Sequence, residues 1–205
     1  MIHNPVRPLR SASYGVFALG TVLALGACSG PNLDELRAGP VPEDSPELDK
    51  SGLPPEPTKD APVSERVEWS LIETTSVYAR WYGDGVEADC PEVSGSGGFG
   101  SSEDITCTVT VDGISAKWDV SIGSIMSEME PVDGRHVVRS AVEDVARYKT
   151  KSEHVRCEMD EVQLVSPDDE PITCVWANED DHGRLVMRLD NMQFSDKSFW
   201  LTSAD

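Results

Sequence analysis

Ile105-Thr106-Cys107-Thr108-Val109-Thr110-Val111 alternates apolar and polar residues without a break, and Asp112-Gly113 follows it directly. This alternation places Ile105, Cys107, Val109 and Val111 on one face and three threonines on the other, which is typical of a half-buried β-strand. After Asp112-Gly113 the same period returns in Ile114, Ala116, Trp118, Val120 and Ile122. An Asp-Gly pair between two alternating runs is a strong hairpin signal. The stretch 105–122 therefore predicts an antiparallel hairpin with one buried face.

Four cysteines lie before, within and after this hairpin at a regular spacing. Cys90 and Cys107 are 17 residues apart, Cys157 and Cys174 are also 17 apart, and the second pair follows the first by 67 residues. The neighbours of the later cysteine in each pair agree as well, since Asp104-Ile105-Thr106-Cys107 resembles Pro171-Ile172-Thr173-Cys174. The sequence therefore predicts an internal repeat.

Helical periodicity precedes the first cysteine of each pair. In the second copy Val138, Ala141, Val142 and Val145 follow the i, i+3, i+4, i+7 pattern. Asp133, just after Pro131, is the expected N-cap of that helix. In the first copy Ser64 is the expected cap of a helix whose apolar positions include Val67, Leu71 and Tyr78.

Downstream of its helix the second copy alternates less cleanly. Its strands are expected around Ile172, Cys174 and Trp176 and around Leu185, Met187 and Leu189, on either side of a hairpin turn containing Gly183. A short strand ending at the first cysteine of each pair is expected to pair with the strand that carries the second. Each copy is thus a helix followed by three strands.

The predicted fold class is α+β, with two tandem repeats at residues 64–130 and 131–205, each a helix packed on a small antiparallel sheet with one disulfide. Four cysteines allow three connectivities, and the repeat favours Cys90 with Cys107 and Cys157 with Cys174. A four-cysteine metal site is the alternative. Metal-binding thiols usually come in closer C-x-x-C pairs, and an exported chain favours disulfides, so no metal is expected.

The N-terminal residues have the layout of a secretory signal peptide. Arg7 and Arg10 precede an apolar run from Tyr14 to Ala27, which is too short for a bilayer-spanning helix. At its end, Leu25-Gly26-Ala27-Cys28 resembles the lipobox of bacterial lipoproteins. The resemblance implies removal of residues 1–27, lipidation of Cys28, and stable anchoring on the extracytoplasmic face of the cell membrane. The alternative is an ordinary cleaved signal with a chance cysteine, which releases a free protein.

The segment 28–63 is expected to be a disordered tether. It holds eight prolines and many acidic residues but almost no large apolar side chain, so it buries too little apolar surface to offset its ordering entropy. A fully extended Pro-rich segment of this length reaches roughly 100 Å. The tether would then place the folded part at a distance from the membrane.

The chain is strongly acidic, with a formal net charge of −20. Cleavage before Cys28 removes two arginines and leaves 15 basic and 37 acidic residues, a net charge of −22. This balance argues against nucleic acid, which is bound by Lys and Arg. Its simplest role is solubility, and the functional alternative is attraction of a basic protein partner.

No catalytic constellation is visible in the sequence, and no cofactor is expected. His136, His154 and His182 stand in no ligand-spaced motif and are expected to be solvated. The clusters Asp168-Asp169-Glu170 and Glu179-Asp180-Asp181 lack EF-hand spacing and are expected at loop tips. The Gly-Ser run 94–102 is expected to be a flexible loop. The tail Phe199-Trp200-Leu201 is expected to be a final strand.

The run from Ser70 to Ile122, with Tyr82-Gly83, Cys90-Pro91, Cys107-Thr108-Val109 and Asp112-Gly113, resembles a small cysteine-paired domain of unknown function found in actinobacterial envelope lipoproteins. The resemblance implies a fold and an envelope location, and no activity. The leading expectation is a non-enzymatic binding module. One alternative is an inhibitor or immunity-type protein that captures a basic enzyme, similar in layout to secreted β-lactamase-inhibitory proteins. The other is an envelope enzyme or small-ligand carrier.

Overall fold

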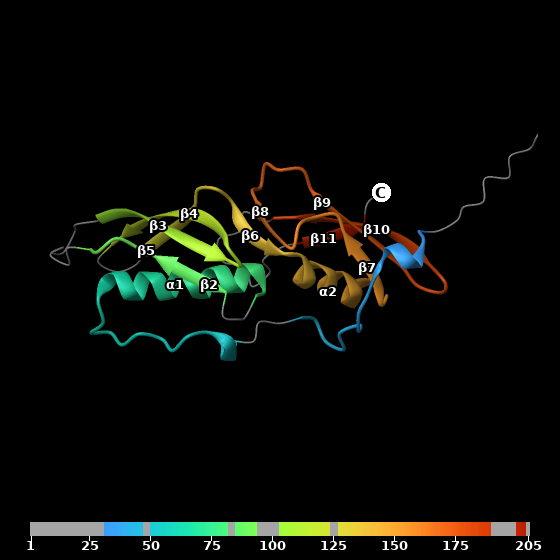
Figure 1. Cartoon of the computed structure of the whole chain (residues 1–205), viewed down its shortest axis with the longest axis horizontal. Helices are drawn as coiled ribbons and strands as arrows, with labels where there is room; N and C mark the ends of the chain where they lie inside the picture. The colour runs from blue at the N-terminus through green and yellow to red at the C-terminus, as the bar shows by residue number, and fades with distance from the viewer. Residues whose placement is uncertain are drawn as a thin grey trace, which may run out of the picture.

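The computed structural model describes residues 31–46, 50–81, 85–93, 103–123, 127–189 and 200–203. The signal peptide, Cys28, the Gly-Ser run 94–102 and Phe199 lie outside the described residues. The described part contains two α-helices and mostly antiparallel sheets, so the α+β class is confirmed. The helices and sheets form two groups along the long axis of the molecule (Figure 1).

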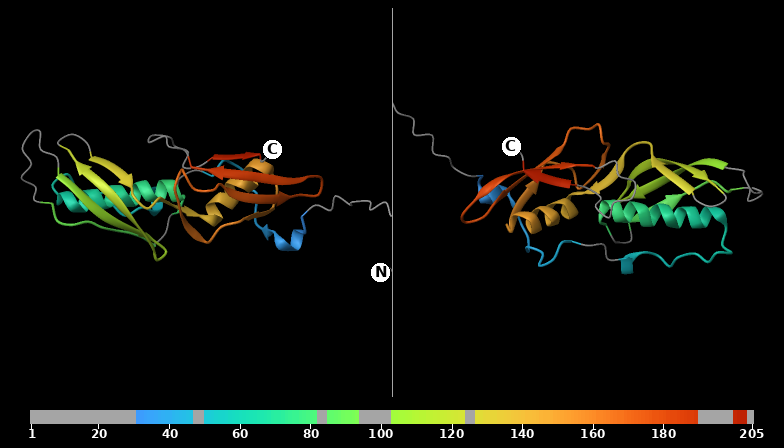
Figure 2. Two further views of the ribbon diagram at one scale, coloured as in Figure 1. Left: turned by 90° about the horizontal axis from the view of Figure 1, so that it is seen from above. Right: turned by 180° about the vertical axis from the view of Figure 1, so that it is seen from behind.

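We call the group at one end the first half. Its elements are α1 (Val63–Ala79), β2 (Val86–Asp89), β3 (Glu103–Val111), β4 (Ile114–Ile122) and β5 (Ser127–Pro131). The four strands form an antiparallel sheet in the order β2-β3-β4-β5, so the predicted count of three strands is wrong by the edge strand β5. The helix α1 lies along one face of this sheet (Figure 2).

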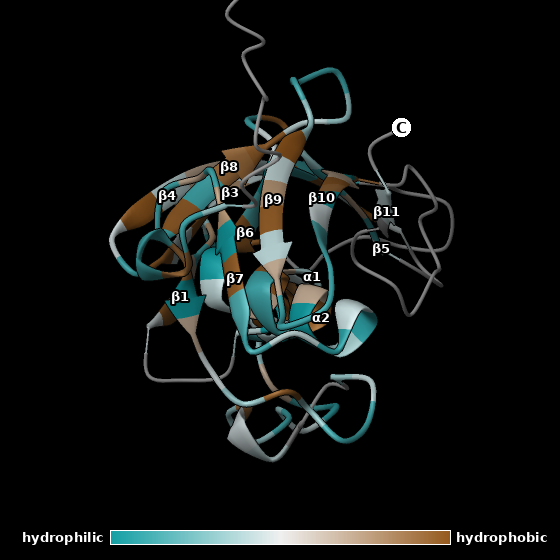
Figure 3. Ribbon diagram, turned by 90° about the vertical axis from the view of Figure 1, so that its right-hand side faces the viewer, coloured by the Kyte–Doolittle hydropathy of each residue, from teal (hydrophilic) through white to brown (hydrophobic). Residues whose placement is uncertain are grey.

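We call the group at the other end the second half. It contains β6 (Arg135–Val138), α2 (Arg139–Thr150), β7 (His154–Cys157), β8 (Val162–Val165), β9 (Ile172–Ala177), β10 (His182–Arg188) and β11 (Trp200–Ser203). Its main sheet has the order β1-β7-β9-β10-β11, where β1 is Arg37–Ala38, and β6 pairs separately with β8. Seen down the long axis, α2 lies below β9 and β10 (Figure 3).

The hairpin predicted over 105–122 is confirmed. Strands β3 and β4 are paired along their whole length, from Glu103 opposite Ile122 to Val111 opposite Ile114. Asp112 and Gly113 both have positive φ, 48° and 80°, as a two-residue turn of the primed type requires. The right-handed twist of the strands favours this turn, and Gly113 adopts its φ without steric cost.

Each helix packs its apolar side chains against the disulfide-bearing strands of its own half. In the first half, Val67 and Leu71 of α1 pack with Cys107, Val109, Trp118 and Val120. In the second half, Val142 and Ala146 of α2 pack with Val155, Cys174, Leu185 and Met187. These side chains are at most 5% exposed, so each half has a closely packed apolar core.

A third buried cluster joins the two halves. It combines Ala79 of α1, Val111 of β3, Val138 of β6, Ala141 of α2 and Val162 of β8. After β5 the chain remains bonded to β4, since the backbone N–H of Val132 donates to Lys117 O and Asp133 Oδ2 accepts from Lys117 N–H. The division at 130/131 therefore falls in a packed connection between the halves.

Both predicted helix starts are wrong in detail. Asp133 does not cap α2, because the strand β6 lies between them and Val138 is the residue before the helix. Val138 fits the helical period by coincidence; it forms a strand pair with Val162. In the first half α1 begins at Val63, one residue before the expected cap Ser64, and Pro62 precedes it.

The expected turn containing Gly183 is also wrong. Gly183 lies inside β10 opposite Trp176, and the turn spans 178–181, where the Asn178 side chain accepts from the N–H groups of Asp180 and Asp181. A Cβ at residue 183 would lie 3.1 Å from the indole nitrogen of Trp176. The glycine therefore permits close packing of the aromatic ring. The final strand is confirmed, since Trp200–Ser203 pairs with β10 as β11.

The segment 28–63 differs from the expected free tether. Within its described residues the 3₁₀ turns η1 (Leu33–Glu35) and η2 (Lys50–Gly52) flank β1, which joins the edge of β7. Further along, the Arg80 guanidinium donates to Pro46 O and the Trp69 indole N–H donates to Pro54 O at 2.9 Å. The segment passes beneath both helices (Figure 1). The β1–β7 pairing and side-chain hydrogen bonds to backbone carbonyls, which composition does not reveal, hold the described residues there.

Candidate functional site

The most distinctive surface of the first half is an acidic patch on the sheet face opposite α1. Two rows of side chains cross strands β3, β4 and β5. One row is Asp104, Ser121 and Glu128, and the other is Thr106, Asp119 and Glu130. We call these six residues the acidic rows. Asp104, Thr106, Asp119, Glu128 and Glu130 are exposed.

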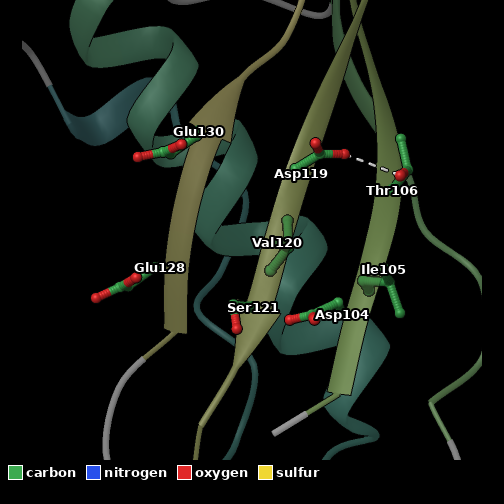
Figure 4. A pocket seen from close by; sticks show the side chains of 8 residues that line it. All are labelled: Asp104, Ile105, Thr106, Asp119, Val120, Ser121, Glu128 and Glu130. Carbon is green, nitrogen blue, oxygen red and sulfur yellow. Dashed lines mark hydrogen bonds between the residues drawn. The ribbon is translucent and has the colours of Figure 1, made fainter.

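The acidic rows line an open concavity of about 400 Å³ (Figure 4). The hydroxyl of Thr106 donates to Asp119 Oδ1 at 2.9 Å, which orients that carboxylate across the strands. The two glutamates project from β5 at the sheet edge. Carboxylates from three neighbouring strands thus line one concavity, with Asp119 turned toward Thr106 and the two glutamates turned outward from the sheet edge (Figure 4).

The arrangement carries an electrostatic cost. Asp119 and Glu130 are direct cross-strand partners, and like charges at opposed positions destabilise a sheet. Lys117, two residues before Asp119, is exposed on the same face, but its strand partner is Thr108. A ligand that brings positive charge to the concavity relieves this repulsion.

The structure contains two disulfides, Cys90–Cys107 and Cys157–Cys174, the pairs that the repeat favours. Cys157 and Cys174 are direct partners in the β7–β9 ladder. Cys90 directly follows β2, whose last residue Asp89 is paired with Thr108, so it comes next to Cys107. The bridge of the first half thus connects the end of β2 to β3, and the bridge of the second half connects β7 to β9. In each case the first of the two strands directly follows the helix.

A helix glutamate contacts the first cysteine of each bridge. The N–H of Cys90 donates to Glu68 Oε1 at 3.0 Å, and the N–H of Cys157 donates to Glu143 Oε1 at 3.2 Å. Glu143 is 3% exposed, whereas Glu68 is half-buried. The same polar link therefore fastens helix to disulfide in both halves, in a more buried setting in the second.

The buried Glu143 belongs to an ion-pair cluster on α2. The guanidinium of Arg147, 6% exposed, lies 3.5 Å from Glu143 Oε2 and 2.7 Å from Asp144 Oδ1. Arg37 of β1 lies 3.9 Å from Glu143 Oε1. We call Arg37, Glu143, Asp144 and Arg147 the charge cluster. Buried charges are tolerated when they are paired and hydrogen-bonded in this way.

His136 is a buried residue, so its expected place in solvent is wrong. It lies in β6, 1% exposed, with Nε2 2.8 Å from Ile114 O. Because a carbonyl only accepts, Nε2 carries the proton, and Nδ1 has no hydrogen-bond partner among the described residues. Burial lowers the pKa of His136 below its ordinary value, and the bond to Ile114 opposes that shift in part. The side chain joins the two halves as a neutral imidazole.

The other predicted candidates are dispersed. His154 is half-buried in β7, and His182 is exposed at the start of β10. The acidic clusters 168–170 and 179–181 are exposed and lie between strands, as expected for loop tips. In the described part of the chain, no group of three or more His, Cys, Asp or Glu side chains is arranged to hold a metal ion.

Sequence reasoning missed the residues that this geometry brings together. Glu128 and Glu130 alternate with Ser127 and Met129, a strand signal that was hidden by the shortness of β5. Glu143 and Arg147 stand at i, i+4 on a predicted helix, a spacing that favours an ion pair. Arg37 had no local signal at all, since its partners are more than 100 residues away.

No protein-family model, curated protein or solved structure matches this chain. Among the described residues, neither helix is long and apolar enough to cross a membrane.

Proposed function

We propose that the chain is a lipoprotein of the cell envelope, lipidated at Cys28, whose folded region is a non-enzymatic module that binds a basic protein on its acidic rows. The lipobox-like Leu25-Gly26-Ala27-Cys28 and the two disulfides support the extracytoplasmic location, because disulfides persist in oxidising compartments. Membrane anchoring then leaves the sheet of the first half free to meet partners outside the membrane.

The two halves are proposed to be copies of one unit. In each, a helix is followed by four strands of one antiparallel meander, and a disulfide joins the first two of those strands. The helix glutamate that accepts from the first cysteine occurs in both. In this view β1, β6 and β8 are additions to the duplicated unit.

The observation that carries the binding role is the direct opposition of Asp119 and Glu130 in the acidic rows. A sheet under selection for stability alone avoids like charges at this position, whereas a surface that receives Lys or Arg side chains gains from them. Electrostatic complementarity of this kind raises association rates and selects against acidic partners. The class of partner is a basic protein, and an enzyme captured by an inhibitor or immunity-type module is one member of that class.

The proposal is tested by capture from native envelopes with the full lipoprotein as bait. One variant neutralises Asp104, Asp119, Glu128 and Glu130 as Asn or Gln. A matched control neutralises the same number of exposed acids in the second half, at Asp168, Asp169, Glu170 and Asp181. Both variants change the net charge by the same amount, so general charge effects cancel.

We expect the wild type and the control to retain the same basic protein at low salt and to release it as ionic strength rises. The variant of the acidic rows is expected to retain at most a tenth as much. Equal retention by both variants, or saturable retention of an acidic partner, contradicts the proposal.

A further inference from the structure

The N-terminal segment enters the second half as an added edge strand. Arg37 is paired with Val155 and Ala38 with His154 in the β1–β7 ladder, and the N–H of Gly39 donates to Glu153 O at 2.9 Å. The strand is short and lies beside β7 in the view down the long axis (Figure 3). Main-chain pairing of this kind supplies affinity, and side-chain contacts supply specificity.

The first specific contact is made by Arg37. Its carbonyl accepts from Arg147 Nη2 at 3.2 Å, and its guanidinium lies 3.9 Å from Glu143 Oε1. The side chain of Glu143 is 4% exposed, and the guanidinium groups of Arg37 and Arg147 lie beside its carboxylate. The segment thus completes a charge cluster that α2 begins with Glu143 and Arg147.

The second specific contact requires glycine at residue 39. A Cβ there would lie 2.7 Å from Cζ and 2.8 Å from Nε of Arg147. The guanidinium has little freedom to move away, because it is bound to Glu143 on one side and to Asp144 on the other. A docking slot is therefore formed by the edge of β7, Glu143 and Arg147. It fits the sequence Arg-X-Gly, where X is any residue.

We infer that this slot is a docking site for the chain's own membrane-anchoring segment, with Arg37-Ala38-Gly39 as the docked motif, and that docking sets how far the folded region stands from the membrane. The inference rests on the proposed lipidation of Cys28. We call residues 37–39 the anchor latch. Arg37 is nine residues beyond Cys28 in the chain, a separation that spans at most about 30 Å. With the anchor latch released, the chain is free as far as Pro46, whose carbonyl accepts from Arg80, and these 18 residues reach at most about 60 Å.

Docking also orients the molecule. The anchor latch lies at the end of the long axis formed by β7 and β10, and the acidic rows belong to the sheet at the opposite end (Figure 1). The second half is therefore held next to the membrane, and the partner-binding surface of the first half is directed away from it.

The test compares the full lipoprotein with Gly39→Val and with Ala38→Val in vesicles of neutral phospholipid. Residue 38 is exposed, so its substitution adds apolar atoms to the same strand without touching Arg147. Hydrogen exchange reports on the latch. A donor dye is attached at the exposed position 158, just after β7, and the lipid headgroups carry the acceptor. Energy transfer between them reports on the distance of the second half from the membrane.

Gly39→Val is expected to speed amide exchange at residues 37–39 at least tenfold and to lower energy transfer at least twofold. Ala38→Val is expected to match the wild type in both. If Gly39→Val also lowers the unfolding midpoint of the whole chain, Arg37→Gln replaces it as the test variant. The Arg37 side chain is half-exposed, and the same changes in exchange and energy transfer are expected.

Unchanged exchange in Gly39→Val overturns the latch, and faster exchange without a change in energy transfer overturns its role in setting distance. Absence of the wild-type protein from the vesicles contradicts the lipidation proposal instead. In that case hydrogen exchange in solution still decides whether residues 37–39 are docked.

Discussion

The backbone N–H of Cys157 donates a hydrogen bond to the carboxylate of Glu143 across 3.2 Å, which ties helix α2 to the strand that carries the second disulfide. Glu68 and Cys90 make the matching bond at 3.0 Å in the first half. Only Glu143 is also paired with a buried arginine, Arg147. The second half therefore depends more strongly on the charge of its glutamate.

Replacement of Glu143 by Gln is expected to lower the free energy of unfolding by about 2–3 kcal/mol, because it leaves Arg147 buried with Asp144 as its remaining ion-pair partner. Glu68→Gln is expected to cost less than about 1 kcal/mol, since glutamine still accepts from the N–H of Cys90. Urea unfolding under oxidising conditions measures both. Equal losses for the two variants would contradict this account of Glu143.

Loss of either disulfide is expected to lower the free energy of unfolding by roughly 3 kcal/mol, because each closes a loop of about 16 residues and restricts the unfolded chain. The double substitutions Cys90→Ala with Cys107→Ala and Cys157→Ala with Cys174→Ala test each bridge alone. Thermal unfolding with and without reductant gives the measurement. A wild-type protein whose unfolding midpoint does not respond to reductant would contradict the prediction.

The regular parts of the fold were predictable because local patterns encode them. The hairpin 105–122 shows unbroken alternation around Asp112-Gly113, and each helix shows an apolar face at helical spacing. The strand β6 was not predictable in this way. Val137 and Val138 fit a helix as well as a strand, and their partners in β8 lie some 25 residues downstream, between the cysteines of the second bridge.

The candidate sites were largely hidden in the sequence, because they form between distant residues. The acidic rows depend on the register of three strands, which places Asp119 opposite Glu130. The docking of Arg37 depends on Glu143 and Arg147, which are buried only once the fold has formed. Composition carried no information on the backbone pairing of Arg37 and Ala38 with β7.

Stability is expected to depend on the protonation of His136 below pH 6.5. Burial lowers the pKa of His136 in the folded state beneath its ordinary value of 6.5, so the unfolded chain takes up the proton first. The contribution of neutral His136 to the free energy of unfolding is therefore fully present above pH 6.5. It declines as the pH falls, by at most about 1.4 kcal/mol per pH unit.

His136→Asn retains an N–H donor for Ile114 O but does not titrate. The difference in unfolding free energy between wild type and variant, measured by urea unfolding from pH 8 to pH 5, isolates the histidine from the many carboxylates. We expect the free energy of unfolding of the wild type to fall relative to that of the variant as the pH falls. A difference that stays constant across the range would contradict the buried, neutral state.

Asp119→Asn is expected to raise the free energy of unfolding by about 0.2–1 kcal/mol at low salt, because it removes the repulsion of Glu130 across the strands. The gain should shrink as salt screens the exposed pair. Asp168→Asn, at an exposed loop site, is the matched control for net charge. A stabilisation of the control as large as that of Asp119→Asn would mean that overall charge, and not this pair, is responsible.

The central claim is an envelope lipoprotein whose folded region is held together by two matched disulfides. Intact-mass analysis and non-reducing peptide mapping of the protein extracted from its native membrane test it most directly. We predict loss of residues 1–27, acyl chains on Cys28, and the pairs Cys90–Cys107 and Cys157–Cys174. An unacylated chain with free thiols at all four of the later cysteines would contradict it.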